Sequence, residues 1–241
     1  MKNEISLCMI VKNEELVLER CLNCVKNIAD EIIIVDTGST DKTKEIAYKY
    51  TSKVYDFEWV DDFSKARNFS FSKATKDYIM WLDADDVIDT KNIKKILDLK
   101  NNINPNVDIY MFVYNYSFDS NNYPKVIQKR ARLLKREKNY KWISPIHEVI
   151  IPSGNIIYTD ICINHNKLKI NEPDRNLKIF QKMEKDKIDF DIRQEYSYAH
   201  EYFYRKDYNK TISMLESLIN KYEPKYTSHT RFLYKSLLDL S

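Results

Sequence analysis

The chain has 241 residues, which is room for one large domain or for one domain with an appendage. Hydrophobic residues make up 43% of it, and the net charge of +3 is too small to predict a general affinity for nucleic acid or anionic membranes. No apolar run reaches the roughly 18 residues of a membrane span, and the first residues resemble no signal peptide. The 4 cysteines lie on apolar faces of predicted elements, which favours buried thiols in a cytoplasmic protein.

The first part of the chain alternates predicted strands with predicted helices. Apolar runs at 5–11, 31–35 and 53–59 predict strands. Between the first two, Leu18 and Cys21 begin an apolar helix face. Strand, helix and strand at this density predict an α/β fold, with a mostly parallel sheet, right-handed crossovers and helices on both faces.

The second predicted strand ends in an acid. Asp36 opens a turn that carries Gly38 and leads into a helix. An acid in this place suits a nucleotide site, because it can accept a hydrogen bond from a uracil N–H or a ribose hydroxyl; the alternative is helix capping. The chain has neither the glycine-rich dinucleotide fingerprint nor a Walker phosphate loop.

Residues 78–86 form an apolar run that ends abruptly in three carboxylates. Ligands of open α/β sheets collect at the carboxyl ends of such strands. In an extended segment Asp83 and Asp85 point to the same side, so a hard divalent cation could join them. The alternative is a solvated acidic turn that caps the next helix. A calcium loop of the EF-hand type is excluded, since Ile88 and Lys94 stand where it needs glycine and glutamate.

The chain continues with a predicted helix at 92–100, an aromatic strand at 108–116, a loop at 118–124 and a basic strand at 126–136. Within the basic strand we expect Arg132 to face inward, near a diphosphate. A solvated edge strand is the equal alternative, because lysine protects sheet edges.

The last predicted strand, 156–165, ends at His165. Its imidazole could complete a metal site with Asp85. A structural or surface role for this histidine is equally open.

From Pro173 helical periods replace strands, which predicts two domains, 1–170 and a helical appendage at 171–241. One helical hairpin with flanking helices cannot bury its own apolar face. The tail should therefore pack on the first domain, on a second copy in a homodimer, or on further residues, and an apolar helix at 233–240 near the end suggests a shortened chain or a dimer. A lid or dimer element is favoured over a docking site for an acceptor. Part of a tetratricopeptide pattern is present at Tyr198, Tyr202, Tyr208, Ile212, Leu215 and Pro224.

Three motifs, at 10–14, 34–41 and 81–86, together resemble the family-2 glycosyltransferases of the GT-A fold. The segment 59–68 between them resembles the same family. The chain is most similar to a branch with bacterial peptide, flagellin and cell-surface glycosyltransferases. The resemblance covers residues 4–90 strongly and residues 125–170 more weakly.

The resemblance implies a site for a sugar nucleotide and a metal ion. Asp85 would ligate Mn²⁺ or Mg²⁺, with Asp83 and His165 as further ligands. The fork of Arg67 suits a diphosphate or a nearby carboxylate, although an ordinary helix-surface arginine is the alternative. The residues implied to bind the nucleotide sugar are Val11, Glu14, Asp36, Asp62, Arg67, Asp83, Ala84 and Arg132.

The segment 142–148, which ends in His147 and Glu148, looks like the acceptor side of the family. An inverting transfer needs a base that takes the proton from the attacking nucleophile. Glu148 is the candidate base, and His147 is a weaker one that could instead contact sugar or phosphate. The sequence departs here from family members that carry Glu-Asp or a lone Asp, and a surface role for Glu148 is the alternative.

The resemblance implies inverting, metal-dependent transfer of a sugar from a UDP-sugar to a protein, peptide or glycan acceptor. A nucleotidyltransferase is one alternative, but it would need a basic, glycine-rich loop where this chain has Lys12-Asn-Glu-Glu. A non-catalytic module that binds a nucleotide sugar or a protein is the other, and the intact acids argue against it.

Overall fold

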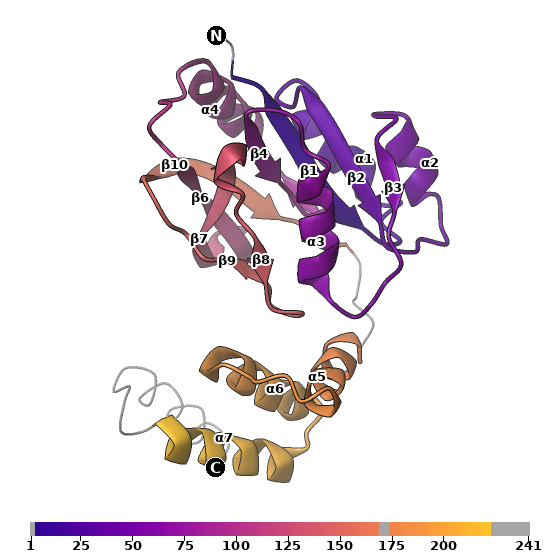
Figure 1. Cartoon of the computed structure of the whole chain (residues 1–241), viewed down its shortest axis with the longest axis vertical. Coiled ribbons are helices and arrows are strands. Elements are labelled where there is room, and N and C mark those ends of the chain that lie inside the picture. The colour runs from indigo at the N-terminus through magenta and orange to yellow at the C-terminus, as the bar shows by residue number, and fades with distance from the viewer. Residues whose placement is uncertain (1–2, 169–173, 223–241) are drawn as a thin grey trace. The chain divides into compact units, whose positions relative to one another are not determined.

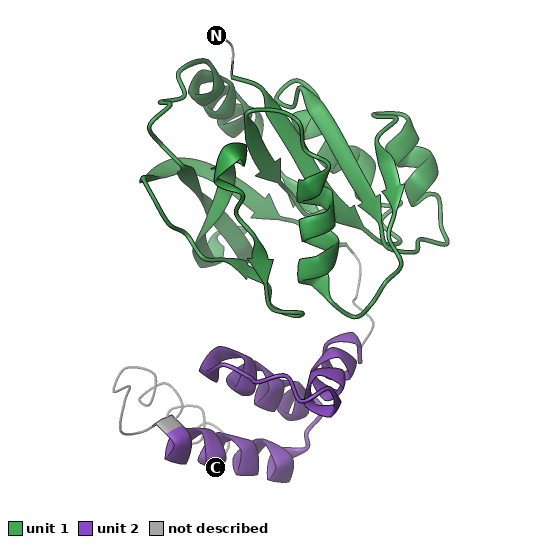
Figure 2. Ribbon diagram, in the orientation of Figure 1, with its two compact units in different colours: residues 1–170 green, residues 171–241 purple. Residues whose placement is uncertain are grey.

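The computed structural model describes residues 3–168 and 174–222. The chain divides into two compact units, 1–170 and 171–241, which are coloured separately in Figure 2.

The first unit is built on an eight-stranded sheet with the strand order β3-β2-β1-β4-β7-β6-β10-β5. Pairs β1–β2, β2–β3, β1–β4 and β6–β10 are parallel, whereas β4–β7, β6–β7 and β5–β10 are antiparallel. The strands are β1 (Ile5–Val11), β2 (Glu31–Asp36), β3 (Val54–Asp56), β4 (Tyr78–Trp81), β5 (Asp86–Val87), β6 (Ile109–Phe118), β7 (Pro124–Lys135) and β10 (Ile156–His165). A separate pair joins β8 (Trp142–Ile143) to β9 (Val149–Ile150).

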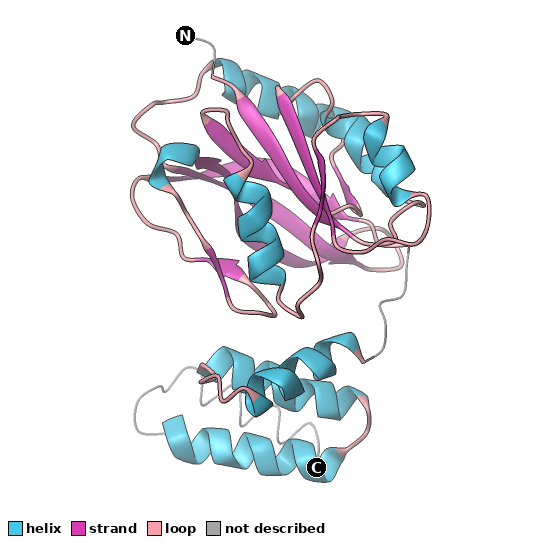
Figure 3. Ribbon diagram, turned by 45° about the vertical axis from the view of Figure 1, so that its right-hand side comes forward, coloured by secondary structure: helices cyan, strands magenta, loops and turns pink. Residues whose placement is uncertain are grey.

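Helices cover both faces of this sheet (Figures 1 and 3). They are α1 (Leu18–Val25), α2 (Thr43–Tyr48), α3 (Phe63–Ser72) and α4 (Thr90–Asn101). One core cluster joins the sheet to α1, α2 and α4 through residues such as Leu22, Ala47 and Ile96. The other joins its opposite face to α3 and to the β8–β9 pair through Phe71 and Trp142. The predicted fold class, a mostly parallel sheet with helices on both faces, is confirmed.

The predicted basic strand, 126–136, corresponds to β7, which lies between β4 and β6 in the sheet. Strand β7 pairs with β6 along most of its length and with β4 through Leu133, Leu134 and Lys135, so its inner end lies inside the sheet and the edge-strand alternative is wrong there. Its inner half, from Ala131 to Leu134, is buried, because two neighbouring strands and both core clusters surround it. The lysine-rich outer half, with Lys125 and Lys129, is exposed.

The second unit contains helices α5 (Arg175–Lys185), α6 (Ile192–Tyr204) and α7 (Tyr208–Tyr222). Helices α6 and α7 pack through Ala199, Leu215, Leu218 and Ile219. Pro173, Pro224 and the predicted helix at 233–240 lie outside the described residues. Among the helices that are described, none is both long and apolar enough to cross a bilayer.

Candidate active site

Polar side chains collect at one edge of the sheet, where β1, β2 and β4 all end. Val11 at the end of β1 lies beside Asp36 at the end of β2, and β4 runs parallel to β1 on its other side. Strands are spaced about 4.8 Å apart, so the turn after β4 lies about 10 Å from Asp36 along this edge. The side chains of Val11 and Ala84 pack into the hydrophobic core rather than into this edge.

Asp36 is buried, with 2% of its surface exposed. One oxygen, Oδ1, accepts hydrogen bonds from the backbone N–H groups of Gly38 (3.0 Å) and Ser39 (2.8 Å). The other oxygen, Oδ2, is buried and has no hydrogen-bond partner among the described residues. Asp36 therefore shapes the turn, as the capping alternative proposed, and still presents one oxygen that a ligand could engage.

The turn after β1 is fastened to the turn after β2. The side-chain oxygen of Asn13 accepts a hydrogen bond from the backbone N–H of Thr40 (2.7 Å). The backbone N–H of Asn13 donates to the Ser39 hydroxyl (2.9 Å). The N–H of Glu14 donates to the Thr43 hydroxyl (2.6 Å). Glu14 is half-buried beside Asp36's turn, which places it at the same edge.

Asp62 lies at the amino end of α3 as its N-cap. Its Oδ1 accepts hydrogen bonds from the Ser64 hydroxyl (2.6 Å) and the Lys65 N–H (3.1 Å), and it is 8% exposed. These bonds give Asp62 a structural role that the sequence reading did not include.

The acidic turn rests on a buried ion pair. Asp86 and Arg132 both have fully buried side chains, and Nη1 of the arginine lies 3.0 Å from Oδ2 of the aspartate. Asp86 also accepts hydrogen bonds from the Tyr114 hydroxyl (2.9 Å) and the Asp83 N–H (3.0 Å). Arg132 does face inward as predicted, but its guanidinium lies beneath the turn, where it neutralises Asp86 and bonds the Trp81 carbonyl (3.0 Å).

Asp85 and His165 meet above this pair, with Nδ1 of the histidine 3.2 Å from Oδ1 of the aspartate. Together with Asp86 they offer three ligand atoms within 4.8 Å of one another. Tyr114 hydrogen-bonds the same Nδ1 (3.0 Å), and Tyr116 stacks on the imidazole at 5.2 Å. Burial lowers the pKa of His165, but the bonds to Asp85 and Asp86 outweigh it and raise this pKa to about 9.

Asp83 points away from that group and toward Arg67. Its Oδ1 lies 2.8 Å from Nη2 of the arginine, while Nε of the same guanidinium lies 2.6 Å from Oε1 of Glu148. Burial raises the pKa of Asp83, but the charges of Arg67 and then Arg132 outweigh it and hold this pKa below its usual value. We expected the side chains of Asp83 and Asp85 to meet at one point. Instead Asp83 is paired with Arg67, and Asp86 joins Asp85 and His165 as the third possible ligand.

The two residues of the predicted acceptor motif lie in the turn between β8 and β9. The Glu148 side chain is 13% exposed and paired with Arg67, so it is not an ordinary surface residue. His147 is exposed and has a positive φ of 50°. Glu148 and Asp83 therefore lie on either side of the Arg67 guanidinium, which bonds both carboxylates.

Two residues of this region, Asp86 and Tyr114, were given no role from the sequence. Asp86 was visible as the third acid of the turn. Nothing in the local pattern of an aromatic strand distinguishes Tyr114 from its neighbours, since its role depends on strand pairing.

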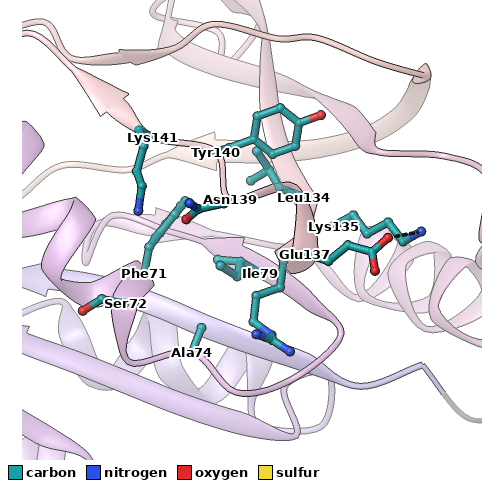
Figure 4. A pocket seen from close by; sticks show the side chains of 11 residues that line it. Phe71, Ser72, Ala74, Ile79, Leu134, Lys135, Glu137, Asn139, Tyr140 and Lys141 are labelled. Carbon is teal, nitrogen blue, oxygen red and sulfur yellow. Dashed lines mark ion pairs between the residues drawn. The ribbon is translucent and has the colours of Figure 1, made fainter.

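A separate concavity of about 280 Å³ lies at the other end of β4 from the acidic turn (Figure 4). Its walls include Phe71, Ile79, Leu134 and Tyr140, and an ion pair joins Lys135 to Glu137 on its rim. None of the acids described above lines it, so it is not the candidate active site.

The residues of this candidate site, from Val11 to His165, lie within a segment that matches a known family. The sequence model described as Glycosyl transferase family 2 matches residues 6–165. The chain belongs to glycosyltransferase family 2. The predicted family is therefore confirmed.

Curated relatives match this chain over part of their length. A TPR repeat-containing protein of Synechococcus elongatus is 33% identical over 147 residues, 61% of this chain and 35% of that protein. An uncharacterized glycosyltransferase of Rickettsia bellii is 41% identical over 86 residues, 36% of this chain and 29% of that protein. The chain thus spans about a third of the length of the curated relatives it matches.

Solved structures confirm the fold of this family 2 domain. Glucosyl-3-phosphoglycerate synthase of Mycobacterium tuberculosis, in complex with Mn²⁺ and UDP-glucose, superposes with a TM-score of 0.51 at 14% identity. The match covers 78% of this chain and 80% of that chain. At this identity the likeness establishes the GT-A-like fold, which the sequence predicted.

Proposed function

We propose that this family 2 domain transfers a sugar from a UDP-sugar to a protein, peptide or glycan acceptor, with inversion at the anomeric carbon and with the help of a divalent cation. One observation carries the proposal. A buried carboxylate with an unpartnered oxygen, Asp36, shares one edge of the sheet with the group formed by Asp85, Asp86 and His165. A nucleoside diphosphate has a hydrogen-bond donor at one end and anionic oxygens at the other, so it would complement Asp36 directly and the second group through a bound divalent cation.

The nucleoside would lie at the turns after β1 and β2. Oδ2 of Asp36 would accept a hydrogen bond from a uracil N–H or a ribose hydroxyl, which would satisfy an oxygen that is otherwise buried without a partner among the described residues. Glu14 and Asp62 would border this position, and the backbone of Val11 and Ala84 would form its floor.

The cation would lie at Asp85 and His165. Carboxylate oxygen and imidazole nitrogen suit Mn²⁺, and carboxylate with phosphate oxygens suits Mg²⁺, so the donor set fits either ion. Asp86 is a weaker ligand, since Arg132, Tyr114 and the Asp83 N–H already engage its oxygens. The bound cation would stabilise the negative charge that develops on the leaving diphosphate.

Glu148 would act as the base. Its carboxylate lies beside the acidic turn, where the anomeric carbon of a bound donor would be, and Arg67 holds it in one orientation. His147, exposed on the same turn, would contact the acceptor. Arg132 would act on the donor through Asp86 and not by direct contact.

The remaining parts of the proposal concern partners and location. The helices of residues 171–241 would form a tetratricopeptide-like appendage that serves as a lid or a homodimer contact, and the protein would act in the cytoplasm. Size-exclusion chromatography with light scattering, with and without the tail, measures the dimer directly.

The test of the function is donor binding with and without metal. UDP-sugars should raise the melting temperature in Mn²⁺ or Mg²⁺ and not in chelator, and calorimetry should give a dissociation constant for UDP. Asp85→Ala should weaken metal-dependent UDP binding about 100-fold, because it removes a ligand of the cation. The matched control is Asp98→Ala, on the exposed side of α4, which should leave binding unchanged. Equal binding by wild type and Asp85→Ala, or no uridine nucleotide bound in metal, contradicts the proposal.

A further inference from the structure

Helix α3 holds the turn that carries Glu148 through backbone contacts. The N–H of Phe63 donates a hydrogen bond to the Pro145 carbonyl (2.8 Å). The Asn68 amide donates to the Trp142 carbonyl and accepts from the Trp142 N–H, both at 2.9 Å. An amide that pairs with both backbone groups of one residue fixes its position and orientation. The turn is therefore located by α3 as well as by the short β8–β9 pair.

Arg67, the residue before Asn68, holds the side chains. Its guanidinium lies 5.0 Å from the ring centre of Trp81 and 4.7 Å from that of Trp142. Its side chain is 10% exposed. The two rings contact each other edge to face, with centres 4.7 Å apart, and the guanidinium lies against both, with Nη2 bonded to Asp83 and Nε to Glu148.

We propose that Arg67 is a positioning residue, which ties the turn of the candidate base, Glu148, to the acidic turn through Asp83, and that it does not bind the diphosphate of the donor. This inference rests on the proposed function for its kinetic consequence, but the tie itself is a property of the fold. The turn that carries Glu148 and the turn that carries Asp83 lie more than 50 residues apart in sequence. A single guanidinium therefore fixes the position of one turn relative to the other.

A diphosphate contact is the competing role for Arg67. It would require the guanidinium to present N–H groups to an anion at the edge of the sheet. In the structure its side chain is 10% exposed, and its guanidinium bonds two carboxylates at 2.6 and 2.8 Å. Two of its five N–H donors are engaged by these carboxylates, so its charge is already paired with two anions of the protein.

The first test measures the tie without any ligand. In Arg67→Gln and Arg67→Lys, amide hydrogen exchange of residues 142–150 should be about tenfold faster or more, because the turn opens more readily. Lysine should not rescue, since one ammonium cannot hold two carboxylates as a fork does. Arg136→Gln is the charge-matched control, because Arg136 is exposed at the other end of β4. Unchanged exchange in both Arg67 variants overturns the inference.

The second test separates positioning from diphosphate binding. In Arg67→Gln, the dissociation constants of uridine and UDP with Mn²⁺ should change by the same factor, about threefold or less, whereas kcat for UDP-sugar turnover should fall about 100-fold. Glu148→Gln should lower kcat similarly, and the double variant should be no slower than either, since both changes remove one positioned base. A loss of affinity for UDP that uridine does not share overturns the inference.

The two tests also separate this inference from the proposed function. If the wild-type protein binds no uridine nucleotide in Mn²⁺, the proposed function fails. The exchange measurement then still decides whether Arg67 holds the turn, because it needs neither donor nor acceptor.

Discussion

Replacing Arg132 with methionine should destabilise the 1–170 unit by about 3–5 kcal/mol, because buried Asp86 would lose its 3.0 Å partner and keep only the more distant imidazole of His165 as a cationic partner. Both side chains are 0% exposed, and the ion pair is 3.0 Å long. The guanidinium also lies 3.7 Å from the ring centre of Trp81 and 4.4 Å from that of Tyr114. Such desolvated cation–π contacts contribute about 2 kcal/mol, and part of this is included in the cost of breaking the pair.

Burial of the Arg132–Asp86 pair also has a free-energy cost, because part of the guanidinium makes no hydrogen bond to the part of the chain that the structure describes. Nε and Nη2 of Arg132 are buried without a hydrogen-bond partner among the described residues. Removing both charges together should therefore cost less than the two single changes added. The double variant Arg132→Met, Asp86→Asn should recover at least about 1–2 kcal/mol of that sum.

The assay is urea unfolding followed by tryptophan fluorescence. The 3 tryptophans, Trp59, Trp81 and Trp142, all lie in the 1–170 unit, so the signal does not report on the helical tail. The exposed Arg136→Met serves as the control and should change the free energy of unfolding by less than about 0.5 kcal/mol. A cost below about 1 kcal/mol for Arg132→Met, or a double variant that equals the sum of the singles, would refute the reasoning.

Two further predictions concern the stability of the same unit. Burial raises the pKa of Glu31, but hydrogen bonds led by the one from Lys53 outweigh it and lower this pKa from 4.5 to about 2. Stability on the order of 2–3 kcal/mol should therefore be present above pH 4.5 and be lost as the pH falls toward 2, and Glu31→Gln should remove that pH dependence in acid unfolding. Gly154→Ala should destabilise by more than about 1 kcal/mol, because φ is +84° and a Cβ would lie 2.3 Å from Oδ2 of Asp108; a melting temperature equal to that of the wild type would contradict this.

The sequence was sufficient for elements whose burial follows from a local pattern. The apolar runs at 5–11 and 156–165 became β1 and β10 with the same bounds. Residues 126–136 were ambiguous because their outer half is basic and exposed while their inner half is buried. Only the pairing of β7 with both β4 and β6 decides between an edge and an interior strand, and this pairing joins segments distant in the chain.

For the candidate site, the sequence identified residue types and the order of the turns, but not which side chains meet. The expectation that Asp83 and Asp85 point to the same side assumes that the strand continues to Asp85. The chain instead turns after Trp81, with the Asp86 N–H bonding the Asp83 carbonyl at 3.0 Å, so the extended alternation ends before the acids. The partners of these acids, Arg67 and Arg132, come from α3 and β7, and no local pattern specifies such contacts.

The carboxylates at this edge differ in how fully their oxygens are engaged. Asp86 is neutralised by Arg132 and accepts two further hydrogen bonds, and Asp83 is paired with Arg67. Oδ2 of Asp36, by contrast, is buried without a partner among the described residues, which costs about 1–3 kcal/mol until a donor meets it. Asp85 faces an imidazole that can exchange its proton for a metal ion. Under the proposed function, ligand binding would therefore gain most at Asp36 and Asp85, and we expect the other two acids to hold these in place.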